Sequence, residues 1–231
     1  MIKNFLNNLY RNAVNLNHDN IINLFDYKSD AFFLDLGCDT GSFSLKIADK
    51  IRTKNIFGVE IVPERIVVAQ DRGIQVKNFD LNQKFSFPDN HFDAIHANQV
   101  IEHLIDSDNF LSEIHRVLKP GGYAVISTEN LSSWCNIFAS IMGWQVFSLT
   151  NFSTKALSIG NPFSLHRGKK VEYSSWNHVR IYNVFGLKEY FEVFGFKVEK
   201  IVGAGYFPLP SILGKIDPVH SHFISFKIRK I

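Results

Sequence analysis

Short apolar runs bounded by turn residues recur along the chain and predict buried strands. They cover residues 32–35, 56–59, 74–79, 92–97, 123–128, 196–202 and 223–230. Segments with a helical spacing of apolar positions lie before or between these runs, at residues 1–29, 42–51, 63–71, 131–143 and 184–194. Strands that alternate with helices predict an α/β fold, in which helices cover both faces of a mostly parallel sheet.

The first predicted strand runs into a tight glycine loop, in the stretch F-F-L-D-L-G-C-D-T-G from Phe32 to Gly41. Ligands of open α/β sheets bind where such loops leave the carboxyl ends of strands. Gly37 and Gly41 carry no Cβ and let the backbone approach a ligand closely. A dinucleotide fingerprint needs glycine where Asp39 stands, and this carboxylate would repel a pyrophosphate. The loop therefore favours a nucleotide-type cofactor other than a dinucleotide.

The pattern D-x-G-x-x-x-G, from Asp35 to Gly41, resembles motif I of the class I S-adenosylmethionine (SAM) methyltransferases. Three later features follow in the order seen in that superfamily. They are Asp80-Leu81, F-S-F-P-D-N-H-F-D-A-I at residues 85–95, and I-H-R-V-L-K-P-G-G at residues 114–122. The resemblance runs from residue 32 to about residue 130. It implies a Rossmann-like sheet of seven mostly parallel strands, with helices on both faces and an antiparallel last strand.

The resemblance also implies SAM as the cofactor and assigns residues to its parts. Glu60 follows the second strand about twenty residues past the loop, where an acidic residue binds ribose hydroxyls. We expect Asp80 beside the adenine, with Leu81 against the ring. Asp39 replaces a glycine of the superfamily, and aspartate tolerates left-handed backbone better than most residues. The expected cofactor site is Asp35, Gly37, Asp39, Gly41, Glu60, Ile61, Asp80, Leu81 and Asn98.

Composition adds limits to this interpretation. With 231 residues, 45% of them hydrophobic, the chain can bury one sizeable core, and we expect a single domain over residues 1–231. We see no signal peptide and no long apolar span, and the two cysteines lack metal-ligand spacing, so a cytoplasmic protein is expected. A net charge of +3 is a weak indication of a nucleic-acid partner.

Residues 131–182 lie between the predicted fifth strand and the last helix, and they read as an insertion or lid over the carboxyl edge of the sheet. The predicted helix 131–143 carries an aromatic stripe. Such stripes usually belong to the core, which we favour, although this one would also suit an apolar wall for an acceptor. The leading segment 1–29 reads as one or two helices, which either cross the cofactor site or pack on the sheet.

Methyl transfer to oxygen benefits from a base that removes the hydroxyl proton. His103 follows the fourth strand and is the first candidate, and His178 in the insertion is the second. Tyr173 and Arg180 are expected to help bind the acceptor. Ubiquinone-pathway O-methyltransferases show Glu-x-x-Glu-His at this position, which is taken as a metal site. Because Gln99 replaces the first Glu here, we expect no metal.

Three functions stay open at this point. The first is SAM-dependent methylation of a hydroxyl on a small molecule or a glycan. The segments N-L-S-S-W, G-N-P, H-V-R-I-Y and G-A-G-Y-F-P-L-P resemble methyltransferases of bacterial surface-polysaccharide gene clusters. The acceptors of those enzymes are taken to be sugars or lipid-linked glycans, so peripheral membrane contact fits. The second is a nucleic-acid methyltransferase, prompted by the basic residues His166, Arg167, Lys169 and Lys170. The third is a SAM-binding scaffold without catalysis, prompted by Asp39 and Gln99.

Overall fold

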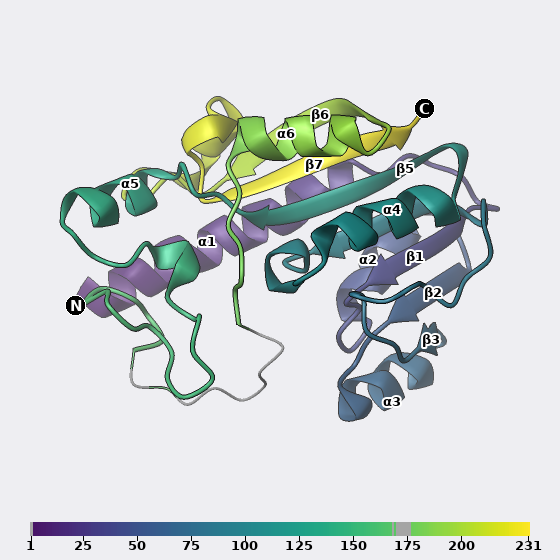
Figure 1. The fold of residues 1–231 in the computed structure, drawn as a ribbon, viewed down its shortest axis with the longest axis horizontal. Helices are drawn as coiled ribbons and strands as arrows, with labels where there is room; N and C mark the ends of the chain where they lie inside the picture. Colours follow the sequence, from purple (N-terminus) through teal and green to yellow (C-terminus); the bar gives the residue numbers. More distant parts are fainter. Residues whose placement is uncertain (1, 168, 170–176) are drawn as a thin grey trace.

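The computed structural model describes residues 2–167, 169 and 177–231, and it contains a seven-stranded sheet with the order β3-β2-β1-β4-β5-β7-β6 (Figure 1). Strand β7 runs antiparallel to both of its neighbours, and the other pairs are parallel. The α/β fold with an antiparallel last strand is therefore confirmed. The strands are β1 (Phe32–Leu36), β2 (Asn55–Val59), β3 (Gln75–Lys77), β4 (Phe92–Asn98), β5 (Leu118–Glu129), β6 (Phe196–Ala204) and β7 (Phe223–Lys230).

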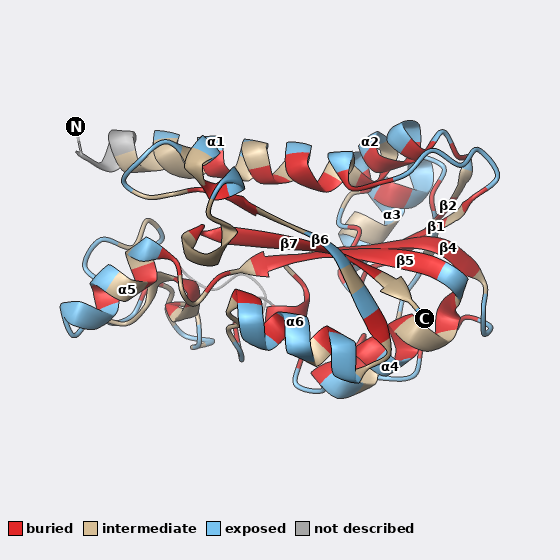
Figure 2. Ribbon diagram, turned by 90° about the horizontal axis from the view of Figure 1, so that it is seen from above, coloured by how far each residue is buried: buried red, intermediate tan, exposed pale blue. Residues whose placement is uncertain are grey.

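In the described part of the chain, six α-helices sandwich this sheet or extend beyond it. Helices α1, α2 and α3 lie on one face, and α4 and α6 on the other, with the buried strands between them (Figure 2). The leading segment forms a single long helix. The helices are α1 (Ile2–Asn23), α2 (Ser42–Ile51), α3 (Pro63–Asp71), α4 (Ser107–Val117), α5 (Trp134–Ile141) and α6 (Val184–Val193).

Strand β1 is buried on both faces, which is why its sequence is a continuous apolar run and does not alternate. Leu34 packs into the larger core, which contains residues of α4 and α6. Its neighbour Phe33 packs into the second core with residues of α2, because successive side chains of a strand point to opposite faces. Full burial of an aromatic or aliphatic side chain contributes about 1.5–3 kcal/mol. The two cores together hold the strand ends of the site in place.

Helix α1 packs on the sheet through a polar contact in its middle. The Asn17 side-chain nitrogen donates to the Ser127 hydroxyl at 3.1 Å, and the Asn17 oxygen accepts from the Ser225 hydroxyl at 2.9 Å. Asn17 also donates to the side-chain oxygen of Asn98, at 3.4 Å. The helix therefore lies on the face of β5 and β7 and reaches the end of β4.

The segment 131–182 extends past the end of β5, as Figure 1 shows for α5. It leaves and rejoins the sheet at a bridge between Asn130 and Tyr182. Helix α5 is shorter than the predicted 131–143, and its side chains Trp134, Phe138 and Ile141 are 42%, 49% and 78% exposed. The expectation that this helix forms core is therefore wrong. Among the described residues, no helix has both the length and the apolarity to cross a membrane.

Candidate functional site

The candidate site lies where the strand order reverses. Strand β1 pairs with β2 on one side and with β4 on the other, and Leu36 is in register with both Val59 and Ala97. The loops after β1, β2 and β4 therefore leave the sheet at one place. Such a switch point is the usual ligand position in doubly wound sheets.

The loop after β1 turns through three left-handed residues, Gly37, Asp39 and Gly41, with φ of 76°, 49° and 77°. A Cβ on Gly37 would come within 2.8 Å of the Val100 side chain. Glycine is needed at position 37 for both its conformation and its packing. Asp39 adopts the left-handed conformation that the sequence anticipated for it, and its carboxylate pairs with Arg65 of α3 at 3.1 Å.

The Asp35 carboxylate is buried beneath this loop, and protein groups engage both of its oxygens. Ser44 of α2 donates to Oδ2 at 2.5 Å, and Nδ1 of His96 lies 2.7 Å from Oδ1. Asp35 thus ties β1 to α2 and β4. Sequence reasoning missed His96, whose Nε2 atom is buried without a partner among the described residues. The signal available for it was a polar residue in the middle of an apolar strand.

Glu60 lies at the end of β2, and its side chain turns back onto the backbone. Oε2 accepts the Asp39 N–H at 3.0 Å, and Oε1 accepts the N–H groups of Ile61 and Val62, both at 2.9 Å. Only 8% of the residue is exposed. The Glu60 carboxylate therefore organises the loop after β1 as well as the start of α3.

The remaining predicted cofactor residues differ in exposure. Asp80 is exposed, and its Oδ1 accepts the Asn82 N–H at 2.9 Å in a turn after β3. Leu81 is buried in the larger core. Ile61 is 44% exposed beside Glu60, which leaves an apolar surface available to an adenine ring. Asn98 is partly buried and accepts from Asn17 of α1.

The carboxylates at this edge of the sheet fit SAM better than a phosphate-containing nucleotide. Carboxylates follow three neighbouring strands: Asp39 after β1, Glu60 after β2 and Asp80 after β3. Carboxylates accept bonds from ribose hydroxyls and attract an amino group, whereas they repel phosphates. SAM carries hydroxyls, an amino group and a sulfonium charge. The charges at this edge of the sheet therefore match that cofactor.

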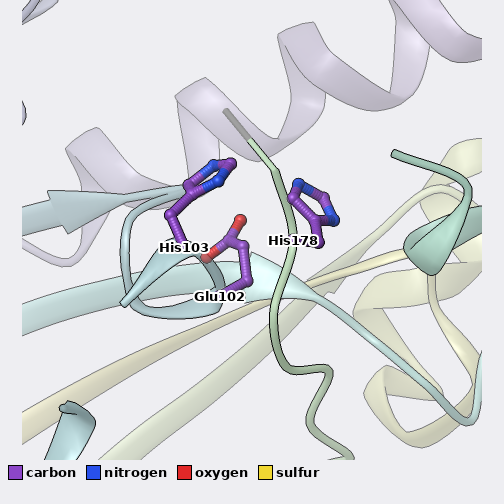
Figure 3. Close-up of side chains that lie close together, drawn as sticks. All are labelled: Glu102, His103 and His178. Atoms are coloured by element: carbon purple, nitrogen blue, oxygen red, sulfur yellow. The ribbon is translucent and has the colours of Figure 1, made fainter. Parts of the chain in front are cut away.

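A second group of side chains lies just after β4. Glu102 and His103 belong to the short 3-10 helix η1 (Ile101–His103), and His178 comes from the returning part of the insertion (Figure 3). The Val179 and Arg180 N–H groups donate to the Glu102 carbonyl at 2.9 and 3.3 Å, which fixes the neighbouring His178. The two imidazole rings lie 4.7 Å apart between centroids. The structure thus brings together both histidines that the sequence predicted.

The three side chains of this group are buried or half-buried, and burial shifts all of their pKa values. Burial raises the pKa of Glu102 to about 8, and Glu129 adds to the effect. Burial lowers the pKa of His103 to about 4, with a further contribution from His178. Burial also lowers the pKa of His178. Both imidazoles are therefore neutral at pH 7 and carry a lone pair.

The Glu102 side chain has no ordinary partner. Only 1% of the residue is exposed, and neither carboxylate oxygen has a hydrogen bond among the described residues. The Thr128 hydroxyl opposes the rise in the pKa of this carboxylate, but it too lacks a partner at hydrogen-bond distance among the described residues. One ligand atom from each of Glu102, His103 and His178 lies within 4.8 Å of the other two. The residues therefore fit a divalent cation, although Gln99 replaces the first carboxylate of the motif.

The other residues expected at the acceptor lie elsewhere. The Arg180 guanidinium bonds the Ser107 hydroxyl at the start of α4, so it faces away from the histidines. Tyr173 and Lys170 lie outside the described residues, whereas Arg167 and Lys169 are exposed.

Sequence reasoning missed Glu129 at the end of β5. Burial raises the pKa of Tyr10 in α1 to about 12, and the nearby charge of Glu129 adds to this effect.

An open groove of about 510 Å³ lies beyond the end of β5. Its walls come from α5, from the start of α6 and from the short 3-10 helix η5 (Pro218–His220). Trp134 stacks on His220 at 4.6 Å beside it. The lining residues are largely apolar: Leu131, Ser132, Ile137, Ser140, Ile141, Asn183, Phe185, Val219 and His220.

Comparison with known proteins agrees with this geometry. A family model described as a methyltransferase domain matches residues 10–201. Because this range covers most of the chain, the protein belongs to that family of methyltransferase domains. The cofactor of the class is SAM, as the sequence predicted.

The individual relatives are distant. An uncharacterised methyltransferase of Schizosaccharomyces pombe is 32% identical over 114 residues, which are 44% of this chain and 41% of that protein. The human mitochondrial ubiquinone biosynthesis O-methyltransferase is 29% identical over 125 residues, which are 50% of this chain and 33% of that enzyme. The chain therefore matches less than half the length of either relative.

A solved structure shows the same fold over nearly the whole chain. It is a SAM-dependent methyltransferase of Thermotoga maritima, described as a possible histamine N-methyltransferase. Its TM-score is 0.64 at 20% identity, and the match covers 99% of this chain and 97% of that one. The likeness establishes the architecture, and the acceptor has to be argued from the site.

Proposed function

We propose that the protein transfers the methyl group of SAM to a hydroxyl group of a small-molecule or glycan acceptor. The observation that carries this proposal is the cluster of Glu102, His103 and His178 near the glycine loop. Val100, two residues before Glu102, lies against Gly37, so the cluster and the loop are close neighbours. A hydroxyl acceptor needs a base near the cofactor to take its proton, and the neutral imidazoles of His103 and His178 can serve as that base.

The protein's part in such a reaction is mainly alignment. SAM supplies the reactive methyl group on its sulfonium sulfur. The acceptor oxygen has to lie in line with the bond that breaks, and holding it there accounts for much of the rate enhancement. His103 and His178 have Nδ1 engaged by the carbonyls of Asn177 and Ser148, at 3.1 and 2.7 Å. Nε2 of each ring therefore stays an acceptor for the hydroxyl proton.

The groove beyond β5 supports a larger acceptor than a simple alcohol. Its apolar lining, and the exposed Trp134 and Phe138 of α5, suit the lipid part of a lipid-linked glycan or the faces of sugar rings. Leu131 in its wall follows Glu129 by two residues, so the groove starts near the end of β5. We therefore propose that the reacting hydroxyl lies at the histidines and the rest of the acceptor along the insertion.

Calorimetric titration with S-adenosylhomocysteine, with NAD as the control, tests the cofactor site. We expect micromolar binding of S-adenosylhomocysteine alone. Transfer of labelled methyl from SAM to lipid-linked glycans, free sugars and small alcohols then tests the acceptor class. RNA is assayed alongside these acceptors, and labelled RNA as the only product would overturn the small-molecule or glycan acceptor in favour of a nucleic acid. Cofactor binding without transfer to any acceptor would favour a non-catalytic scaffold.

A further inference from the structure

We propose that Glu102, His103 and His178 bind a divalent transition-metal cation, and that His178 supplies the ligand that the chain lacks at Gln99. Two imidazoles and one carboxylate suit Zn²⁺, Co²⁺ or Fe²⁺ better than Mg²⁺ or Ca²⁺, which prefer oxygen ligands. The sequence predicted no metal, because only Glu102 and His103 of the motif are present. His178 lies 75 residues away from His103 along the chain, and only the fold brings it close.

The Glu102 carboxylate is the first observation behind this proposal. It is almost fully buried, and both of its oxygens lack hydrogen-bond partners among the described residues. A buried carboxylate without a partner is costly, so such groups in proteins are paired or coordinate a metal. No lysine or arginine pairs with Glu102 in the described part of the chain. A bound cation would displace the proton of this carboxyl group and coordinate its oxygens.

The orientation of the two imidazoles is the second observation. Nδ1 of His103 contacts the Asn177 carbonyl and Nδ1 of His178 the Ser148 carbonyl. A carbonyl oxygen can only accept, so Nδ1 carries the proton in both rings and Nε2 holds the lone pair. Metal-binding histidines use this arrangement, in which a backbone carbonyl fixes the tautomer and aims the other nitrogen.

The third observation is how His178 is held. Two backbone hydrogen bonds join Val179 and Arg180 to the backbone carbonyl of Glu102. The side chain of this same residue is a proposed ligand. The His178 N–H donates to the Asn151 carbonyl at 3.1 Å. The position of His178 relative to Glu102 is therefore built into the backbone, and it needs no acceptor or cofactor to form.

A cation at this place would occupy both Nε2 lone pairs, so the cation, in place of the two histidines, would bind the acceptor oxygen and favour loss of its proton. That consequence rests on the proposed function, whereas the metal site itself does not. Zn²⁺ with three protein ligands keeps a fourth position for water or substrate. Here the acceptor hydroxyl would take that position.

The test is metal binding by the full-length protein in the absence of SAM and acceptor. Protein stripped with a chelator is titrated with Zn²⁺ by calorimetry and with Co²⁺ by visible absorption. We expect one equivalent to bind with micromolar affinity or better, and the Co²⁺ bands to report nitrogen ligands. His178→Ala and Glu102→Gln should each weaken binding at least about tenfold. His166→Ala, at an exposed histidine of the same insertion, is the matched control and should bind like the native protein.

Failure of the native protein to bind either ion below 100 µM, on the order of ordinary surface affinity, would overturn the proposal. Equal binding by His178→Ala and the native protein would also overturn it. Circular dichroism and S-adenosylhomocysteine binding show whether each variant is folded, and His178→Asn replaces any alanine variant that is not. Metal binding without methyl transfer to a hydroxyl leaves this site intact and refutes the proposed function. If the protein binds no metal and methyl transfer to a hydroxyl survives chelation, the proposed function stands and the metal site is refuted.

Discussion

The backbone N–H of Asp39 donates a hydrogen bond to Oε2 of Glu60, over 3.0 Å. This bond joins the loop after the first strand to the end of the second strand. The other Glu60 oxygen accepts the N–H groups of Ile61 and Val62, just before α3 begins. One carboxylate thus sets the shape of the cofactor loop before any ribose is bound.

Glu60→Ala should therefore lower both SAM affinity and stability. Three backbone N–H groups would lose their acceptor, and the one buried donor among them, the Val62 N–H, would cost about 1–3 kcal/mol if left unsatisfied. We expect S-adenosylhomocysteine affinity to fall at least about tenfold, together with a lower Tm in thermal denaturation. Glu64→Gln, on an exposed position of α3, is the control. Unchanged affinity in the Glu60 variant would place the ribose elsewhere.

Gly37→Ala should cost more stability than Gly73→Ala. Both glycines have positive φ, 76° and 86°, so both substitutions incur about 1–2 kcal/mol of backbone strain. At Gly73 nothing lies within 4 Å of an added Cβ, whereas at Gly37 the Val100 side chain lies at 2.8 Å. Urea denaturation of the two variants isolates the packing contribution. Val100→Ala should cost less stability in the Gly37→Ala variant than in the native protein, and equal losses in both single glycine variants would contradict this account.

Glu113 should make stability depend on pH in the acid range. The hydrogen bond from Arg116 lowers the pKa of Glu113, burial opposes this, and the Phe85 N–H adds to the lowering. Because the folded pKa lies below the unfolded one, the contribution is complete above about pH 4.3 and is lost as the pH falls through the folded pKa. Glu113→Gln should cost about 1–3 kcal/mol at pH 7. The difference from native protein in denaturant titrations should shrink toward pH 3, and a constant difference would refute this ionic role.

Both cysteines should react slowly with thiol reagents while the protein is folded. Burial raises the pKa of Cys135 to about 11, and burial, with Asp35 and Glu60, raises the pKa of the Cys38 thiol as well. Since the thiolate is the reactive species, labelling of Cys135 at pH 8 should be about a hundredfold slower than that of a free thiol. Both thiols should react at once in denaturant. Rapid labelling of one thiol in the native protein would show that its surroundings open.

Much of the sheet could be predicted from the sequence, because its strands are buried on both faces. Phe33 and Leu34 show the reason, since each packs into a different core and the strand reads as an unbroken apolar run. The position of Glu60 also followed from the length of one βα unit. Its burial did not, because hydrogen bonds to a neighbouring loop leave no periodic trace in the sequence.

The insertion was harder to predict, since its apolar residues do not report burial. Trp134 and Phe138 have the spacing of a core helix and yet are 42% and 49% exposed. The pairing of His178 with Glu102 depends on two backbone hydrogen bonds that span 77 and 78 positions of the chain, and no local pattern encodes them. Glu129 was missed for a simpler reason, because β5 runs one residue beyond its predicted end.

Those backbone bonds between Val179, Arg180 and Glu102 hold one end of the inserted segment, and the bridge between Asn130 and Tyr182 closes it. Between these anchors, apart from Ser148 and Asn151, whose carbonyls hold His178, the chain can gain, lose or exchange residues while the reactive groups stay in place. The sequence of this segment can therefore vary during evolution without displacing those groups. Descendants of one ancestor would diversify in what they modify while conserving how they modify it.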